Sequence, residues 1–403
     1  MAKLEAAITP LQRPLAARSG RLAVSATAAM LHEAERLRAQ GRDLVDLGVG
    51  EPDFVTPEHI TAAGMAALRD HFTRYTAIGG IASLKDAVTQ AHRRDFGTAY
   101  RPEEVLVTVG GKQALFNATS VLVDHGDEVI LPAPYWVSFY DQIRYAGGKP
   151  MLIETAAAEG FVLDLERVAA AITPRTKAIL LNSPANPSGA VFPPEVVRGV
   201  LELCRRHGLW LISDECYARF VYDAKPHSVG AEPEARDFVV LAGSLSKTYA
   251  MTGWRMGYAL APVPIIQAML KLQSHSTSNA TSFVQVAAIA ALTGTQEPVA
   301  RMLAEYKERR ALIVEGLRAI PGVRCVLPEG AFYAYPNIAA LLGGRGPATA
   351  MEFSQRLLAE TGVVAVPGEA FGGQGHIRFS YATSRAAIGE GLRRLAEFCA
   401  LLK

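Results

Sequence analysis

One lysine stands between two serines where an apolar stretch of the sequence ends. The segment "FVVLAGSLSKTYAMTGWRMGY" (238–258) contains Ser244, Ser246 and Lys247, and Arg255 follows eight residues after the lysine. A lysine amine can form a Schiff base with an aldehyde and can also carry a proton. Hydroxyl groups and a guanidinium suit a dianionic phosphate. These four residues therefore suit a ligand that carries both an aldehyde and a phosphate.

Other chemically useful residues also follow apolar stretches. Asn186 follows "KAILLNSPA", Asp214 follows "LWLIS", and Trp136 follows "DEVILPAPY". Gly110 and Gly111 follow "EVLVTV" and open a helical pattern that Lys112 continues. In an open parallel sheet, ligands bind outside the carboxyl ends of the strands. We therefore expect a carboxylate, an amide, an indole, an amine and a helix start to meet at one edge of a sheet.

A pyridine cofactor with an aldehyde and a phosphate would use all of these groups. The carboxylate of Asp214 would keep the ring nitrogen protonated, which makes the ring an electron sink. The helix start at Gly111 would bind the phosphate, and the indole of Trp136 would stack on the ring. Asn186 and Tyr217 would donate hydrogen bonds to the ring oxygen. Taken singly, each residue also has a structural explanation, such as a helix cap or a turn, so the hypothesis depends on their convergence.

The elements that must position these residues alternate between short apolar runs and helical patterns. The expected strands are 104–109, 127–132, 177–184, 209–215, 237–244 and 256–261. Continuous apolar strands that alternate with helices favour a mostly parallel sheet covered on both faces. The sequence therefore predicts an α/β fold.

The C-terminal third has a different pattern, which predicts a smaller α+β domain. A long helix is expected over 297–320, followed by short strands in 330–338, 362–368 and 376–382 and a last helix from about Ser384. We predict an N-terminal segment (1–45) that packs on this smaller domain and on the entrance of the active site, a large cofactor-binding domain (46–295), and the small domain with its connecting helix (296–403).

Five segments resemble a known family. They are "VTVGGKQALFNA", "NSPANPSGAV", "SDECYARFVY", "SLSKTYAMTGWRMGY" and "HIRFSYATS". They are similar to the class I aminotransferases of pyridoxal-phosphate fold type I, and most similar to the bacterial branch of aspartate aminotransferases. The resemblance runs from about "VSATAAM" to the C-terminus. It implies that fold, amino-group transfer, pyridoxal 5'-phosphate as cofactor, and amino acids and 2-oxo acids as substrates.

The resemblance also implies roles for single residues. Lys247 would hold the cofactor and move the proton, and Asp214 would pair with the ring nitrogen. Tyr217 and Asn186 would bond the ring hydroxyl, and Trp136 would stack on the ring. The residues implied around the phosphate are Gly111, Lys112, Ser244, Ser246 and Arg255.

For the substrate, the resemblance implies that Arg378 binds the α-carboxylate, with help from Asn186 and the backbone of Gly50. It also implies a homodimer with shared sites, in which Tyr75 reaches the neighbour's phosphate and 278–279 lies near the same border.

In the animal and enteric aspartate aminotransferases, an arginine in the segment that corresponds to 272–283 binds the substrate's second carboxylate. This segment contains no arginine here. Lys112 and Thr27 match the bacterial branch, so we expect them to bind this group. L-Aspartate with 2-oxoglutarate is the favoured pair, and prephenate stays open as an alternative. In one departure from many relatives, Cys216 replaces an aliphatic residue, and we interpret it as a small packed hydrophobe.

Composition narrows the class of protein. The net charge of +2 does not favour nucleic acid as a partner. No apolar stretch approaches the length of a membrane span, and four cysteines without a C-x-x-C pair favour a cytoplasmic protein. We predict no metal site. A carbon–sulfur lyase or decarboxylase on the same fold remains an alternative. A cofactor-sensing regulator is disfavoured, because such proteins carry a DNA-binding module ahead of the aminotransferase domain, and the ~45 residues expected there are too few and too weakly basic. A nicotinamide dehydrogenase is disfavoured because the dinucleotide fingerprint is absent.

Overall fold

A seven-stranded sheet forms the centre of the computed structural model, which describes residues 15–22, 26–344 and 346–402. The strand order is β2-β8-β7-β6-β5-β3-β4, and only β8 runs antiparallel to its neighbours. The strands are β2 (Val105–Thr108), β3 (Glu128–Ala133), β4 (Lys149–Glu154), β5 (Thr176–Asn182), β6 (Trp210–Asp214), β7 (Val239–Ser244) and β8 (Gly257–Leu260). The predicted mostly parallel sheet is confirmed.

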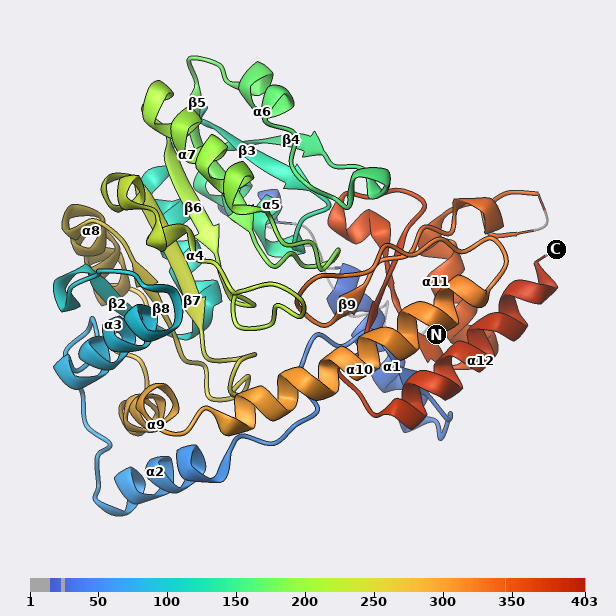
Figure 1. Ribbon diagram of the computed structural model, residues 1–403, viewed down its shortest axis with the longest axis horizontal. Coiled ribbons are helices and arrows are strands. Elements are labelled where there is room, and N and C mark those ends of the chain that lie inside the picture. Colours follow the sequence, from blue (N-terminus) through green and yellow to red (C-terminus); the bar gives the residue numbers. More distant parts are fainter. Residues whose placement is uncertain (1–14, 23–25, 345, 403) are drawn as a thin grey trace.

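Helices cover both faces of this sheet, as Figure 1 shows. Successive strand residues point to opposite faces. Ile212 accordingly packs in one buried cluster with α4, α5 and α8, whereas its neighbour Leu211 packs in another with α6 and α7. The bounds are α4 (Gly110–Leu122), α5 (Val137–Ala146), α6 (Leu165–Ala171), α7 (Pro194–His207) and α8 (Val263–Ser274). Burial on both faces explains why the central strands read as unbroken apolar runs.

Strand β4, at the edge of the sheet, was not predicted from the sequence. Ile153 is the one buried residue of this strand, and the rest are exposed or half-buried. Pro150 lacks an N–H group and is tolerated at an edge. The strand therefore has neither the apolar run nor the clean alternation that predicts a strand.

A single long helix, α10 (Glu297–Ala319), runs along the molecule from α9 to the C-terminal elements (Figure 1). Beyond it, β11, β12 and β9 form a small antiparallel sheet, and β1 pairs in parallel with β10. The bounds are α9 (Ser282–Thr293), β9 (Tyr333–Ala334), α11 (Ala350–Thr361), β10 (Val363–Val364), β11 (Val366–Pro367), β12 (Ile377–Ser380) and α12 (Arg385–Leu401). The expected long helix and last helix are both present.

Two N-terminal elements reach beyond the central sheet. Helix α1 (Ala26–Ala39) packs Met30, Ala34 and Leu37 against Leu358 and Val364 of the C-terminal part. The strand β1 (Val45–Asp46) follows it and leads back toward the large sheet.

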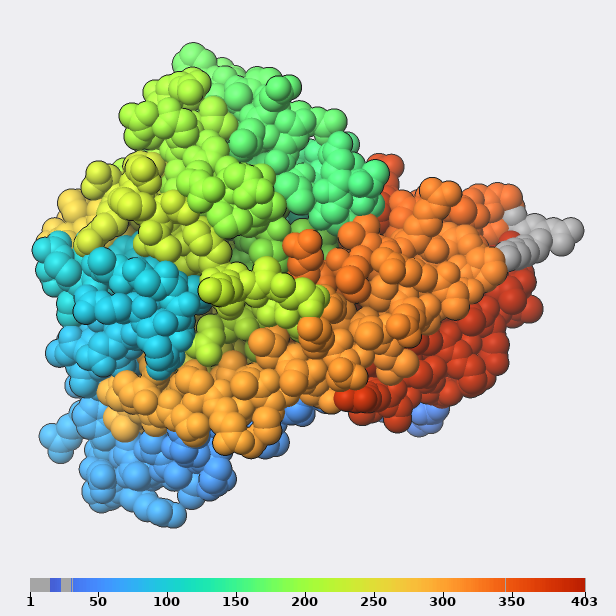
Figure 2. Space-filling view, in the orientation of Figure 1, coloured from blue at the N-terminus to red at the C-terminus, as the bar shows by residue number. Residues whose placement is uncertain are grey.

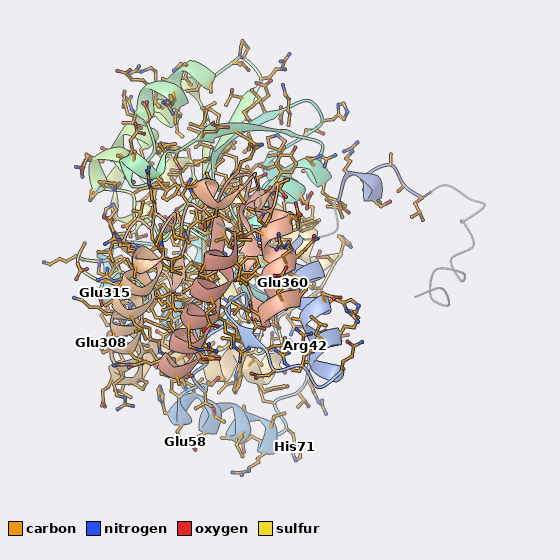
Figure 3. The ribbon with its side chains drawn as sticks, turned by 90° about the vertical axis from the view of Figure 1, so that its right-hand side faces the viewer. Arg42, Glu58, His71, Glu308, Glu315 and Glu360 are labelled. Atoms are coloured by element: carbon orange, nitrogen blue, oxygen red, sulfur yellow. The ribbon has the colours of Figure 1, made fainter. Side chains whose placement is uncertain are left out.

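Helix α2 (Glu58–Arg69) lies at the lower edge of the molecule in Figures 2 and 3. In Figure 3, Glu58 is labelled at its start and His71 just beyond its end. Helix α3 (Ala82–Phe96) leads from it back to the sheet. Among the described residues, no helix combines the length and the apolarity that a membrane crossing requires.

Candidate active site

The largest cavity described lies at the carboxyl ends of the central strands and has a volume of about 630 Å³. Asp214 ends β6, Ser244 ends β7, and α4 begins just after β2. Parallel strands deliver their ends to one edge, so the sheet itself gathers these groups. The predicted site residues that line the cavity are Gly50, Gly111, Lys112, Trp136, Asn186, Asp214, Tyr217, Ser244, Ser246, Lys247, Arg255 and Arg378.

The carboxylate of Asp214 is buried in this cavity. Its side chain accepts one hydrogen bond, from the backbone N–H of Cys216 at 3.0 Å. Burial raises the pKa of Asp214 to about 7. A buried carboxylate with so little compensation favours a cationic or protonated partner. None of the described lysines and arginines lies at hydrogen-bond distance from it, so a ligand group can take this position.

The amine of Lys247 extends into the same cavity. It donates a hydrogen bond to the backbone oxygen of Gly50 and lies 5.9 Å from the ring centre of Phe332. Burial lowers the pKa of Lys247, and a lower pKa increases the fraction of neutral, nucleophilic amine. This position and the lowered pKa would allow Lys247 to react as a nucleophile with a carbonyl group.

Arg378, in β12, is a buried cation at the side of the cavity toward the C-terminal part. Its Nη1 donates to Oδ1 of Asn186 at 2.9 Å, and its Nη2 donates to the backbone oxygen of Gly48 at 2.7 Å. Its Nε is buried and has no hydrogen-bond partner among the described residues. Burial lowers the pKa of Arg378. An unmatched N–H on a buried guanidinium fits an anionic ligand such as a carboxylate.

A second anion-binding arrangement lies at the start of α4. Gly110 has a φ of +76°, and a Cβ there would lie 2.5 Å from Nη2 of Arg255, so only glycine lets this guanidinium approach the helix start. Ser244 accepts a hydrogen bond from the backbone of Ser246 at 3.1 Å. Helix N–H groups, hydroxyls and a guanidinium together suit a phosphate.

Lys112 lies in the first turn of α4 and lines the same cavity. Its Nζ is 5.0 Å from the ring centre of Trp136, and burial lowers its pKa, with a smaller contribution from Arg255. This position is compatible with a phosphate contact and with a contact to a substrate carboxylate. Thr27, the expected second partner of that carboxylate, belongs to α1, but its side chain lies outside what the structure describes.

Tyr75 lies away from this cavity. It is 90% exposed, and neither it nor residues 278–279 line the cavity in the isolated chain. Their expected role concerns a second subunit.

Three features of the site were missed from the sequence. Asn182 accepts a hydrogen bond from the backbone of Asn186 at 2.8 Å and donates to the backbone oxygen of Asp214 at 3.1 Å. Tyr333 contacts Tyr217 through their hydroxyl groups at 2.7 Å. Thr252 donates a hydrogen bond to Glu51 at the edge of the cavity. Asn182 lies near the end of the predicted strand 177–184 and ends the observed β5, which was a usable signal. The other contacts join distant parts of the chain.

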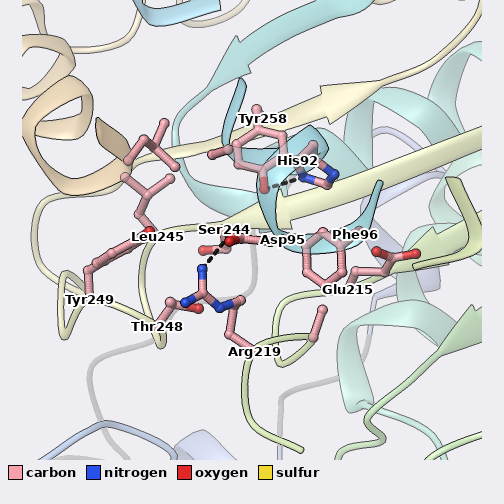
Figure 4. A pocket seen from close by; sticks show the side chains of 13 residues that line it. His92, Asp95, Phe96, Glu215, Arg219, Ser244, Leu245, Thr248, Tyr249 and Tyr258 are labelled. Atoms are coloured by element: carbon pink, nitrogen blue, oxygen red, sulfur yellow. Dashed lines mark hydrogen bonds and ion pairs between the residues drawn. The ribbon is translucent and has the colours of Figure 1, made fainter. Parts of the chain in front are cut away.

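The turn that carries Lys247 separates the main cavity from a second, much smaller one of about 30 Å³, shown in Figure 4. Ser244 lines both cavities. On the far side, Arg219 pairs with Asp95, and His92 is bonded to Tyr258 at 2.7 Å. These pairs line the small cavity together with Leu245, Thr248 and Tyr249, which flank Lys247 in the sequence. The volume suffices for one or two water molecules.

Residues 42–395 match the family model of class I and II aminotransferases. The chain belongs to this family. This aminotransferase is 44% identical to an aspartate aminotransferase of Geobacillus stearothermophilus over 95% of the chain and 98% of the relative. It is also 44% identical to an aspartate/prephenate aminotransferase of Cereibacter sphaeroides, over 94% of the chain and 97% of the relative.

Solved structures agree with the sequence relatives. An aspartate aminotransferase from Thermus thermophilus, determined with maleate, superimposes with a TM-score of 0.91 at 42% identity, covering 96% of this chain and 99% of the other. The enzyme from Rhizobium meliloti gives a TM-score of 0.93 at 41% identity, with the same coverage. The resemblance found in the sequence motifs and the expected fold are thereby confirmed.

Proposed function

We propose that this aminotransferase moves the amino group of L-aspartate to 2-oxoglutarate, with pyridoxal 5'-phosphate as its cofactor. The observation that carries the proposal is that one cavity holds the amine of Lys247, the buried carboxylate of Asp214 and the buried guanidinium of Arg378. An amine for the aldehyde, a carboxylate for the ring nitrogen and a cation for the substrate are the groups that such a reaction requires.

The residues present fit the cofactor. Asp214 would hold the ring-nitrogen proton, because a cation there would compensate its buried charge. The start of α4 at Gly111, with Ser244, Ser246 and Arg255, would bind the phosphate. When bound, pyridoxal phosphate supplies an aldehyde that links to an amine and a ring that accepts electron density from the reacting carbon.

The protein's own groups then divide the work. Lys247 would act first as nucleophile and afterwards move a proton at the substrate's α-carbon, and its lowered pKa suits both tasks. Trp136 and Tyr217 would orient the ring and exclude water.

Arg378 would bind the α-carboxylate of the substrate. The unmatched Nε provides a donor directed along one edge of the guanidinium, and a carboxylate prefers to bind two such donors at once. Asn186, already bonded to Arg378, would limit how the guanidinium can turn.

A dicarboxylate substrate is supported by the relatives. Several are named aspartate aminotransferase, and the Thermus thermophilus structure holds maleate, a dicarboxylate. We propose that Lys112 and Thr27 bind the distal carboxylate. Prephenate is a second candidate substrate, because apolar residues line part of the cavity and several relatives are named for both substrates. The apolar residues are Met30, Leu115, Val137, Val364 and Val366.

We further propose a cytoplasmic homodimer with shared sites. Tyr75 and Arg255 are both exposed in the isolated chain. In the dimer, Tyr75 would contribute to the site of the second subunit, and the second subunit would cover Arg255. The four free cysteines fit a reducing compartment. Each subunit would consist of the segment 1–45, the cofactor-binding domain 46–295 and the small domain 296–403, and α10 would connect the last two.

A half-reaction screen tests the proposal. The protein loaded with pyridoxal phosphate is mixed with single amino acids, and the absorbance change of the cofactor is followed. We expect aspartate and glutamate to convert the cofactor, and 2-oxoglutarate to reverse the change. Prephenate as an acceptor would support the second candidate. Release of pyruvate or ammonia without an acceptor would identify a lyase and contradict the proposal.

A further inference from the structure

Tyr333 is the first residue of β9 and lines the main cavity, although its sequence context predicts only a buried strand. The side chain is 1% exposed. Its ring lies 4.5 Å from the guanidinium carbon of Arg378. A Cβ on Gly50 would lie 2.4 Å from the Tyr333 hydroxyl oxygen, so the phenol fills the space that this glycine leaves. Tyr333 thus packs between Arg378 and Gly50, whose backbone oxygen accepts the hydrogen bond from Lys247.

The hydroxyl of Tyr333 forms one hydrogen bond within the described part of the chain, to the hydroxyl of Tyr217 at 2.7 Å. The two rings meet edge to face, with an interplanar angle of 80°. Two hydroxyl groups in contact share one bond, so one donates and the other accepts. Both tyrosines line the cavity, and neither hydroxyl has another hydrogen-bond partner among the described residues. Tyr217 is the one expected to donate to the ring oxygen of a bound ligand, which leaves Tyr333 as the donor of the shared bond. If Tyr333 donates, both hydroxyl protons are used.

We infer that Tyr333 is a positioning residue of the active site: its hydroxyl donates to the oxygen of Tyr217 and thereby directs the proton of Tyr217 into the cavity, toward the hydroxyl group of a bound pyridine ring. The inference rests on the proposed function, because it assumes that a hydroxypyridine occupies the cavity. It assigns to Tyr333 a role that no motif in the sequence indicates.

Two physical consequences follow from this arrangement. A hydroxyl that accepts one hydrogen bond becomes a better donor in the next, because the chain of bonds is mutually polarised. The proton of Tyr217 is also restricted to one direction, which lowers the entropy lost when the ligand binds. Removing the Tyr333 hydroxyl should therefore weaken the bond from Tyr217 to the ring oxygen, while the contacts to the phosphate and the ring nitrogen remain.

The test compares two ligands that lack an aldehyde and cannot link to Lys247. The cofactor-free protein is titrated with pyridoxine 5'-phosphate and with 3-deoxypyridoxine 5'-phosphate, and both dissociation constants are measured by calorimetry. The dissociation constant of 3-deoxypyridoxine 5'-phosphate divided by that of pyridoxine 5'-phosphate reports the strength of the hydrogen bonds to the ring hydroxyl. We expect Tyr333→Phe to reduce this ratio by roughly 2- to 3-fold, less than the loss of the whole hydrogen bond in Tyr217→Phe, and to leave the 3-deoxy affinity unchanged.

A second tyrosine pair provides a matched control. Tyr381 donates to Tyr222 at 3.2 Å, is fully buried and does not line the main cavity. Tyr381→Phe makes the same chemical change and should leave the ratio at its wild-type value. In a Tyr217→Phe background, Tyr333→Phe should change the ratio no further, because the inferred effect passes through Tyr217.

The outcomes separate the inference from the function on which it depends. If the wild-type protein binds neither ligand, the proposed function fails. If it binds both but Tyr333→Phe keeps the ratio, or lowers both affinities equally, the positioning role is wrong. A crystal structure of the wild-type protein with pyridoxine 5'-phosphate gives an answer even if the variant does not fold. There the Tyr217 oxygen must lie within hydrogen-bond distance of both Tyr333 and the ring oxygen; contact with only one of them overturns the inference.

Discussion

The buried carboxylate of Asp214 should make the cofactor-free protein less stable at neutral pH than a variant without this charge. Burial raises its pKa from an ordinary 3.8 to about 7. A tenfold change in a proton-binding constant corresponds to about 1.4 kcal/mol. The cost of ionising Asp214 in the folded chain is therefore on the order of 4 kcal/mol. Asp214→Asn keeps the shape of the side chain and removes this cost.

Because the pKa of Asp214 is higher in the folded state than in the unfolded state, its effect on stability depends on pH in a defined range. Below pH 3.8 the carboxyl group is protonated in both states, and no cost arises. Between about pH 4 and pH 7 the unfolded chain releases the proton and the folded chain keeps it, so the stability of the wild-type protein falls as the pH rises. The variant lacks this slope. The stability difference in its favour should therefore be small near pH 4 and reach on the order of 4 kcal/mol at about pH 8.

Urea unfolding of the two cofactor-free proteins across this pH range measures the difference directly. Asp223→Asn is a useful control, because Asp223 pairs with Arg310 and Lys307 and its pKa is lowered. That variant should lose stability at about pH 8 instead. A cofactor-free Asp214→Asn protein that is no more stable than wild type at about pH 8, or an advantage that does not vary with pH, would refute the reasoning. In the loaded enzyme Asp214→Asn should lose turnover by about 3–5 kcal/mol in the barrier, because an amide cannot hold the ring-nitrogen proton as a carboxylate does.

Three further predictions concern the roles of single residues. Borohydride reduction of the loaded enzyme followed by peptide mapping should label Lys247, and Lys247→Ala should bind the cofactor but lose turnover by several orders of magnitude; a label on another lysine contradicts the assignment. Lys112→Ala should lower kcat/KM for aspartate by roughly 2–4 kcal/mol and hardly affect alanine, which lacks the second carboxylate. An equal loss for both donors would instead indicate a phosphate contact. Mixing Lys247→Ala subunits with an inactive Tyr75 variant should restore some activity through hybrid sites, and no rescue after subunit exchange would count against a shared site.

The strand ends were predictable because the sheet arranges them by a simple rule. Parallel strands with apolar runs bring their last residues to one edge, and Asp214 and Asn186 reach the cavity in this way. The glycine pair that opens α4 was recognisable for the same reason. The long helix α10 followed from its periodic pattern and the proline after its end.

The contacts across the cavity could not be predicted. The hydroxyl pair of Tyr217 and Tyr333 joins residues far apart in the chain, and neither residue's neighbours encode the other. The edge strand β4 was not predicted because most of its residues are exposed or half-buried, so it lacks the apolar run of the central strands. The sequence therefore indicated which groups converge but not which of them touch.

Arg378 and Lys247 both donate hydrogen bonds to backbone oxygens of the segment Gly48–Gly50: Arg378 donates to Gly48, and Lys247 donates to Gly50. Every residue type has a backbone carbonyl, so a substitution at these positions does not remove the hydrogen-bond acceptors. A larger side chain could instead displace the segment by steric overlap, and the space available differs between Gly48 and Gly50. A Cβ on Gly48 would meet Val364 at 3.1 Å, whereas one on Gly50 would meet the Tyr333 oxygen at 2.4 Å. A saturation library across 48–50 should therefore tolerate most replacements of the exposed Val49, some small ones at 48, and almost none at 50.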